Sequence, residues 1–259
     1  MVPITNPTPD DGDPAVVAVL VGDAAVCTGS LIAPDLVLTA AHCVAGVAPT
    51  EIYFGTTPPD GGERVAVAGS VVHPAFNALT LDNDIGLVRL IHPVRVTPLT
   101  LLGSALDASL ASATIRVAGF GAIDPNDMGP HEKHSGTSQI TTLTATDFTL
   151  MPSPSQPCVG DSGGPAFLDR NGVDYLIGVT SAGDPDCALF ARDIRVDAVA
   201  TFVVPYLDEP AGSEITGGCA ATRDDGVPVW FGLVLAGLAS RRQVTARRRT
   251  QPSSRTRPR

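Results

Sequence analysis

A glycine-rich segment carries the side chain best suited to chemistry in this sequence of 259 residues. Residues 158–165 read CVGDSGGP, with glycines on both sides of Ser162. Glycines let the backbone bend sharply and turn its N–H groups toward one point, which an oxyanion site requires. Such a turn is by itself more often only a turn. As a hypothesis, the segment is a nucleophile loop with Ser162 as the attacking residue.

Two upstream segments supply the partners that a serine nucleophile needs. Acyl transfer requires a neutral histidine that accepts the hydroxyl proton and a carboxylate that orients this histidine. His42 lies in the segment TAAHC beside a cysteine, and Asp84 lies at the start of the alternating segment DNDIGLVRL. Each residue has an ordinary alternative as a strand-end histidine or a turn residue. Together with Ser162 they indicate nucleophilic catalysis.

Short apolar segments bounded by Gly, Pro, Asp or Asn must position these three motifs. They are enriched in β-branched residues, as strands are. The candidates form two similar series, which predict an all-β fold of two barrels at about residues 4–105 and 106–195. The first series is 15–22, 25–32, 36–40, 51–54, 64–72 and 85–90, and the second is 114–120, 138–144, 148–151, 165–168, 175–181 and 189–195.

Two further segments complete the body of the chain. Residues 196–207 have apolar side chains at helical spacing, and we expect one closing helix that is bent or broken at Pro205. Residues 124–136 collect Pro, Asn, Gly, Asp and two histidines, which predicts a surface loop. His131 and His134, with Asp124 or Asp127, would form a metal site, but a solvated polar loop explains the composition. No metal is therefore expected.

Charge is distributed unevenly along the chain. Residues 1–210 hold 8 basic and 24 acidic residues, a balance of 8 − 24 = −16, whereas the whole chain carries −10. The difference arises because eight of the seventeen basic residues lie at positions 241–259. So acidic a body repels phosphates, which argues against a nucleic-acid partner.

Five cysteines, at positions 27, 43, 158, 187 and 219, lack the close Cys-x-x-Cys pairs of zinc sites. Four of them can form two disulfides, which would place the protein in an oxidising compartment. The chain begins Met-Val-Pro, without the basic and apolar regions of an export signal. We therefore expect an exported protein whose upstream signal is missing from this sequence.

The motifs TAAHC, DNDIGLVRL and CVGDSGGP resemble those of the trypsin/chymotrypsin-like serine peptidase family, in the same order and over about 120 residues. Weaker similarity extends from about residue 4 to residue 207. The resemblance implies a chymotrypsin-like fold of two six-stranded antiparallel β-barrels with a C-terminal helix, in a peptidase domain at 4–210. It also implies an endopeptidase that acts on proteins or peptides and requires no cofactor.

The resemblance assigns a role to each residue of the three motifs. His42 would be the general base, Asp84 would orient it, and Ser162 would attack the scissile carbonyl. The N–H groups of Gly160 and Ser162 would form the oxyanion hole. Asp161 would pair with an N-terminal amine that proteolysis frees at Ile4. Residues 1–3 would then be the remnant of a propeptide, although the following TNP departs from the family's usual Ile-Val-Gly-Gly start.

The cysteines acquire expected partners in the same way. Cys27 would pair with Cys43 and hold the histidine segment in place. Cys158 would pair with Cys187 and join the nucleophile loop to the wall of the specificity pocket.

The expected specificity pocket departs from the trypsin pattern. Gln156 lies six residues before Ser162, where trypsin-like enzymes place the aspartate that binds Arg or Lys. Ser181, Ala182 and Gly183 resemble the Ser-Trp-Gly strand that pairs with the substrate backbone, with Ala182 replacing the aromatic residue. With no buried anion in the pocket, we expect weak or no cleavage after Arg or Lys. The alternatives are a catalytically silent homologue that binds a partner and a hydrolase acting on esters.

The C-terminal residues have a different character. Residues 211–226 have a linker composition, and 227–239 are an apolar run that precedes an arginine cluster. With Cys219, these segments resemble C-terminal sorting signals of the myxosortase type. The resemblance implies that Cys219 marks a processing or attachment site and that the protein is attached to the membrane or cell surface. A disordered tail or a single-pass anchor is the alternative.

Overall fold

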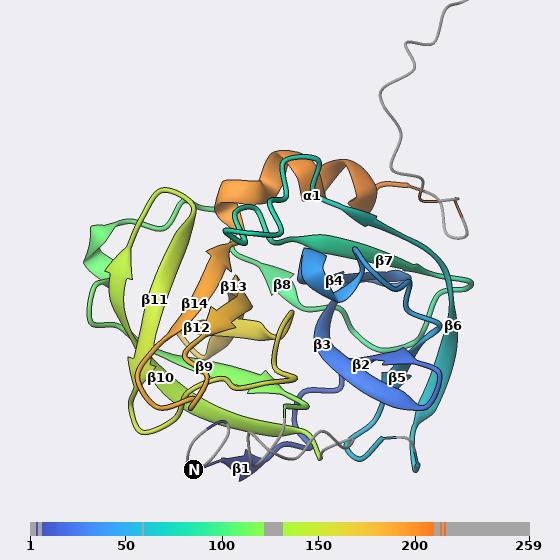
Figure 1. The fold of residues 1–259 in the computed structure, drawn as a ribbon, viewed down its shortest axis with the longest axis horizontal. Coiled ribbons are helices and arrows are strands. Elements are labelled where there is room, and N and C mark those ends of the chain that lie inside the picture. Colours follow the sequence, from blue (N-terminus) through green and yellow to red (C-terminus); the bar gives the residue numbers. More distant parts are fainter. Residues whose placement is uncertain are drawn as a thin grey trace, which may run out of the picture. The chain divides into compact units, whose positions relative to one another are not determined.

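Two closed six-stranded antiparallel barrels and one short helix make up the fold, which confirms the predicted fold class (Figure 1). The computed structural model describes residues 4, 7–58, 60–121, 132–209, 213 and 215. Within these residues no helix is long and apolar enough to cross a membrane. Cys219 and the rest of the predicted sorting segment lie outside them.

The first barrel follows the strand order β2-β3-β4-β7-β6-β5 and closes on itself. Alternate side chains of its strands, such as Val17, Val19, Leu31 and Val37, fill its core. Each such side chain contributes about 1.5–3 kcal/mol when it is buried. The strands are β2 (Val16–Val21), β3 (Ala24–Ala33), β4 (Leu36–Thr39), β5 (Glu51–Phe54), β6 (Glu63–Val72) and β7 (Gly86–Leu90).

The second barrel follows the order β9-β10-β11-β14-β13-β12, and β12 pairs with β9 to close it. Ile115, Ile140, Phe148 and Leu150 lie in its core. The strands are β9 (Thr114–Gly119), β10 (His134–Leu143), β11 (Asp147–Pro152), β12 (Pro165–Arg170), β13 (Val173–Gly183) and β14 (Ala191–Arg195). Two-residue strands β1 (Thr8–Pro9) and β8 (Thr100–Leu101) pair with β10 and β13.

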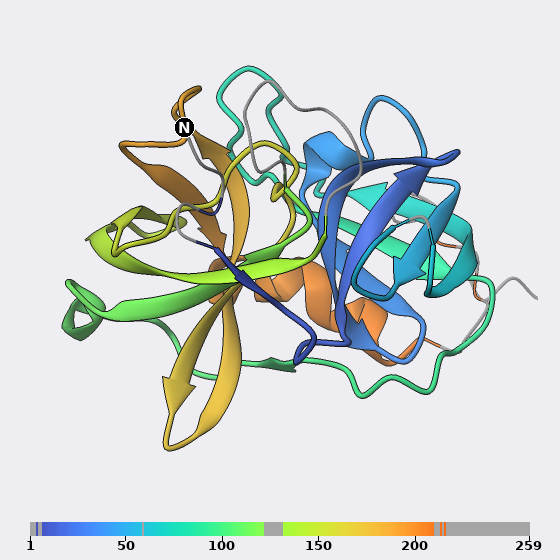
Figure 2. The same ribbon diagram turned by 90° about the horizontal axis from the view of Figure 1, so that it is seen from below.

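The two barrels lie side by side, and a third apolar cluster joins them (Figures 1 and 2). Leu36 and Leu87 enter it from the first barrel, and Val179 and Ile194 from the second. Helix α1 (Ala200–Leu207) contributes Val203, which is fully buried. The helix therefore packs on the seam between the barrels, where it helps to hold them together.

Two sequence-based expectations were wrong in part. Residues 134–136, expected in a surface loop, begin strand β10 and pair with β9. Their polar side chains hid the strand, because a strand is recognised by alternating apolar residues. His131, Asp124 and Asp127 lie outside the described residues, which leaves the loop before residue 132 a prediction.

The closing helix also differs from its prediction. Residues Asp197–Val199 form a 3₁₀ turn rather than the first turn of an α-helix. The buried side chains of Val196 and Val199 attach this turn to the apolar cluster between the barrels. Helix α1 continues through Pro205 to Leu207. Since only two residues follow the proline, little helix remains for it to break.

Arg89 on β7 connects the end of α1 to the first barrel. Its fully buried guanidinium donates to the Asp35 carboxylate at 3.0 Å, the Tyr206 carbonyl at 2.9 Å and the Glu209 carboxylate at 3.0 Å. Asp35 is itself 4% exposed, so it would lose its charged partner inside the protein if Arg89 were removed.

We predict that Arg89→Met lowers the free energy of unfolding by about 3–5 kcal/mol, because it leaves a buried carboxylate without its cation. Urea denaturation would measure the change. Arg64→Met is the control, since Arg64 pairs with the exposed Asp23 and should contribute less than about 1 kcal/mol. Equal effects of the two substitutions would contradict this role of Arg89.

Candidate active site

Strands β4 and β7 bring His42 and Asp84 together. The two strands are antiparallel neighbours in which Thr39 lies opposite Gly86. The chain leaves β4 into a 3₁₀ turn, Ala41–Cys43, and it enters β7 at Gly86, two residues after Asp84. Because the end of β4 lies beside the start of β7, the histidine and the carboxylate meet at the same end of the first barrel.

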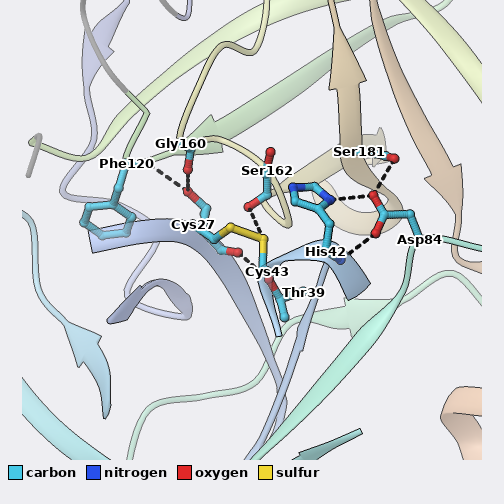
Figure 3. The surroundings of a disulfide bond; sticks show 10 residues. Cys27, Thr39, His42, Cys43, Asp84, Phe120, Gly160, Ser162 and Ser181 are labelled. Carbon is cyan, nitrogen blue, oxygen red and sulfur yellow. Dashed lines mark hydrogen bonds and ion pairs between the residues drawn. A yellow bond between two sulfur atoms is a disulfide. The ribbon is translucent and has the colours of Figure 1, made fainter. Parts of the chain in front are cut away.

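Two hydrogen bonds orient the His42 ring against Asp84. The His42 N–H donates to Asp84 Oδ1 at 2.9 Å, and Nδ1 lies 2.7 Å from Oδ2 (Figure 3). A carboxylate only accepts hydrogen bonds, so the proton is on Nδ1 and Nε2 is left as the basic nitrogen. Asp84 is completely buried, whereas 31% of the His42 side chain is exposed. This arrangement suits a general base that faces a substrate.

Ser181 supplies a contact that sequence reasoning missed. Its hydroxyl donates to Asp84 Oδ2 at 2.7 Å from strand β13 of the second barrel. The sequence analysis assigned Ser181 only to substrate binding. The two residues are 97 positions apart, and no local pattern in the sequence indicates that they meet.

The nucleophile loop is anchored beside the His42 turn. The Ser162 carbonyl accepts the Thr28 N–H at 2.9 Å and lies 3.7 Å from Cys43 Sγ. Cys43 forms a disulfide with Cys27 at an S–S distance of 1.98 Å, the pairing that the resemblance implied. In Figure 3 the His42 ring lies between Ser162 and Asp84. The three side chains are therefore arranged in the order that proton transfer from Ser162 requires.

The same disulfide argues against a metal at this position. A ring nitrogen of His42 and the sulfur atoms of Cys27 and Cys43 all lie within 4.8 Å of one another. The two sulfurs are bonded to each other and cannot act as thiolate ligands. The cluster is thus a disulfide beside a histidine.

The backbone of the nucleophile loop offers two hydrogen-bond donors. Gly160 has φ +94°, a conformation that glycine adopts without strain. Gly163 has φ +83°, and a Cβ there would lie 2.1 Å from the Thr39 hydroxyl. Among the described residues, the N–H groups of Gly160 and Ser162 have no acceptor. Both remain available to a developing oxyanion.

Asp161, between these donors, is a buried acid. Its carboxylate accepts the N–H groups of Gly121 and Cys158, each at 2.8 Å. Burial raises the pKa of Asp161 to about 6, although the two N–H groups lower it in part. No cation among the described residues pairs with it. Ile4 is 3% exposed in the core of the second barrel, against Gly136, where a Cβ would lie 2.6 Å from Ile4 Cγ2.

A pocket of about 170 Å³ opens beside Ser162. Thr180, Ala182, Gly183 and Asp184 line one wall of it. Cys158 and Cys187 belong to the same lining and form the second disulfide, with an S–S distance of 2.01 Å. This bond joins the nucleophile loop to the segment after β13, as the resemblance implied.

Gln156 is fully buried, and its amide is held within the protein. Its Nε2 donates to Asp184 Oδ1 at 3.0 Å and to the Phe190 carbonyl at 2.9 Å. Burial raises the pKa of Asp184, but the N–H groups of Phe190, Ala188 and Leu189 and the Gln156 amide outweigh it and hold this pKa well below its usual range. The pocket wall therefore contains an anion whose oxygens already accept several donors.

Asp193 is a second acid that sequence reasoning missed. It lies on β14 opposite Thr180, a residue of the pocket lining, and is fully buried. No described residue donates a hydrogen bond to either carboxylate oxygen within 3.5 Å. Burial raises the pKa of Asp193 to about 8, and the neighbouring Thr180 hydroxyl lowers it only in part. This raised pKa favours the neutral form of the group at pH 7.

From Gln156 we expected no buried anion that would bind Arg or Lys, and position 156 alone did not reveal these two acids. Neither offers such an anion, since Asp184 already accepts several donors and the raised pKa of Asp193 favours its neutral form at pH 7. The chain between β13 and β14 brings Asp184 into the wall, and the pairing of β13 with β14 brings Asp193 beside Thr180.

We predict that Asp193→Asn stabilises the protein increasingly as the pH rises from about 4 to about 8. The folded state keeps a proton that the unfolded state loses near pH 4, so this aspartate lowers stability across that interval. The melting temperature of the variant minus that of the wild type should grow by several degrees and level off above about pH 8. The exposed Asp169, changed to Asn, is the control. A difference that is independent of pH would contradict the buried, protonated state of Asp193.

Comparison with known proteins agrees with this geometry. The family model described as Trypsin matches residues 4–203, which include His42, Asp84 and Ser162. Human Kallikrein-2 is 31% identical over 210 residues, which cover 70% of this chain and 77% of the kallikrein. Brachyurin of Leptuca pugilator is 30% identical over 196 residues, 66% of this chain and 81% of brachyurin.

A third relative has a different status. Inactive snake venom serine proteinase 13 of Crotalus adamanteus is 33% identical over 217 residues, 74% of this chain and 78% of that protein. Similarity at this level thus extends to a protein that is named as inactive. Since the family model covers most of the sequence, this chain belongs to the trypsin family of serine-type endopeptidases.

Proposed function

We propose that this protein hydrolyses peptide bonds through an acyl-enzyme on Ser162. The observation that carries the proposal is the His42 ring, held by Asp84 through Nδ1 and leaving Nε2 as the base. His42 takes the proton as the Ser162 oxygen attacks the scissile carbonyl, and Asp84 stabilises the resulting imidazolium. His42 then gives the proton to the leaving amine, and a water molecule repeats the sequence to release the acid.

The free backbone donors support the same chemistry. The N–H groups of Gly160 and Ser162 would stabilise the negative charge of each tetrahedral intermediate, a contribution of about 2.7–4 kcal/mol for one donor. A protein that only binds peptides has no need of an oriented base together with unoccupied donors. The inactive relative shows that family membership alone does not establish activity, and the complete set in this chain favours it.

For specificity, we propose a preference for substrates without Arg or Lys before the scissile bond. The Gln156 amide nitrogen donates to Asp184 and Phe190, and Asp184 accepts further backbone donors. The raised pKa of Asp193 favours its neutral form at pH 7. None of these groups offers an unpaired negative charge to a basic side chain at neutral pH. Ala182 leaves the strand beside the pocket without a large side chain.

The direct test is covalent labelling with a fluorophosphonate probe, followed by a peptide library. The wild type should be labelled, Ser162→Ala should not be labelled, and Asp84→Asn should lower kcat by about 10⁴ because the amide no longer favours the required tautomer. Peptides with neutral side chains before the cleaved bond should be cut faster than those with Arg or Lys.

Each outcome separates the alternatives. Labelling that is absent in the folded wild type would favour the silent binding homologue. Turnover of esters without any peptide cleavage would favour the esterase-like hydrolase. Efficient cleavage after Arg or Lys would contradict the proposed specificity while leaving the mechanism intact.

We further propose that cleavage before Ile4 activates the enzyme and that the C-terminal tail is processed at Cys219 in an exported, surface-attached protein. Asp161 supports the first step, because its raised pKa marks a carboxylate that a freed ammonium would stabilise. The two disulfides support export. Intact-mass analysis of active native protein should find Ile4 first and Arg259 absent. Active protein that retains Met1 and Arg259 would contradict both steps.

A further inference from the structure

Thr28 on β3 of the first barrel directs both its hydroxyl and its backbone N–H at carbonyl groups of the nucleophile loop. It is fully buried. Its hydroxyl donates to the Gly160 carbonyl at 2.9 Å and accepts the Phe120 N–H at 3.0 Å. Its own N–H donates to the Ser162 carbonyl at 2.9 Å, and its carbonyl accepts the Thr39 hydroxyl at 2.8 Å. One residue therefore holds the carbonyls of both Gly160 and Ser162.

Those two residues are the ones whose N–H groups are free to bind an oxyanion. Gly160 has positive φ, and the peptide groups beside a glycine rotate at low steric cost because no Cβ limits them. Sterics alone thus leave the direction of its donor undetermined. The Gly160 N–H belongs to the peptide group before the glycine, whereas the hydrogen bond from Thr28 holds the peptide group after it, and so fixes one of the two sides from which Gly160 could turn. Figure 3 shows Gly160 and Phe120, which share the Thr28 hydroxyl, on the side of Ser162 away from His42.

Glycine backbones enclose Thr28 closely. A Cβ at Gly163 would lie 2.3 Å from the Thr28 carbonyl oxygen, one at Gly119 would lie 3.0 Å from its hydroxyl, and one at Gly164 would lie 3.1 Å from its methyl group. A side chain without the hydroxyl would leave the buried Phe120 N–H and the part-buried Gly160 carbonyl without this partner, which costs up to about 1–3 kcal/mol for each group.

We infer that Thr28 is a positioning residue for the oxyanion hole. It contacts no substrate and acts through Gly160, whose N–H it keeps aimed at the developing negative charge. The inference rests on the proposed function, since an oxyanion forms only if Ser162 attacks a carbonyl. Thr28 thus adds a residue of the first barrel to an oxyanion hole whose two donors belong to the second barrel.

The test is Thr28→Val, which keeps the shape and the backbone N–H and removes only the hydroxyl. Counted per site labelled by the fluorophosphonate probe, kcat should fall about 10- to 100-fold, because one oxyanion donor is misaligned rather than lost. KM should change by less than about 3-fold. The inhibition constant of a peptide boronate, which mimics the tetrahedral intermediate, should rise by the same factor as kcat/KM falls. Thr28→Ser should restore kcat to within a few-fold of the wild type.

Thr50→Val is the matched control. The Thr50 hydroxyl also accepts a backbone N–H, from Gly22 at 2.9 Å, and donates to a backbone carbonyl, of Leu20 at 3.3 Å, but it lies on another turn of the first barrel. Its loss should leave kcat and boronate binding unchanged. If Thr28→Val does not fold, Thr28→Ala removes the same hydroxyl without placing a methyl group beside Gly119, and the same loss in kcat is expected.

Two failures can be told apart. A folded wild type that the fluorophosphonate does not label would overturn the proposed function itself. A labelled, active wild type whose Thr28→Val or Thr28→Ala variant keeps the same kcat and boronate affinity would overturn only the role of Thr28. A uniform rise in KM with unchanged kcat would also overturn it, since that pattern indicates weaker ground-state binding.

Discussion

The buried carboxylate of Asp84 is the group on which the rest of the site depends. An ionised side chain in a protein interior is costly unless donors surround it. Asp84 receives the backbone and the ring of His42 from the first barrel and the hydroxyl of Ser181 from the second. The carboxylate is therefore satisfied only when strands β4, β7 and β13 are all in place. The contacts of Asp84 therefore both join the two barrels and orient the His42 ring.

The nucleophile loop depends on both barrels in a similar way. It belongs to the second barrel by sequence, yet Thr28 and the Cys27–Cys43 disulfide hold it from the first. Hydrogen bonds that cross the seam thus link the segments to which we assign the oxyanion donors, the base and the nucleophile. An apolar cluster on the same seam, capped by α1, keeps the barrels from shifting. Contacts between the barrels thus bring these groups to one place although the strands that carry them are short.

Much of the fold and of the candidate site could be predicted, because the strands and the three motifs can each be recognised from neighbouring residues in the sequence. The strands showed β-branched alternation, and His42, Asp84 and Ser162 each lay in a continuous motif. Contacts between distant segments left no such signal. The hydroxyl of Ser181 reaches Asp84 across 97 positions, and Asp193 lies beside the pocket only because β14 pairs with β13. Strand β10 was predicted to begin at residue 138 rather than at His134, because its first residues carry no alternation of apolar side chains.

We propose that the backbone N–H groups of Gly160 and Ser162, two residues whose carbonyls are held from the first barrel, receive the charge that forms when Ser162 attacks. A crystal structure of the active enzyme bound to a peptide boronate tests it most directly. We expect boron bonded to the Ser162 oxygen and one boronate oxygen about 2.7–3.1 Å from the N–H groups of both Gly160 and Ser162. The Thr28 hydroxyl should still contact the Gly160 carbonyl. A boronate oxygen directed to solvent, with the Gly160 N–H turned away, would contradict this role of the two N–H groups.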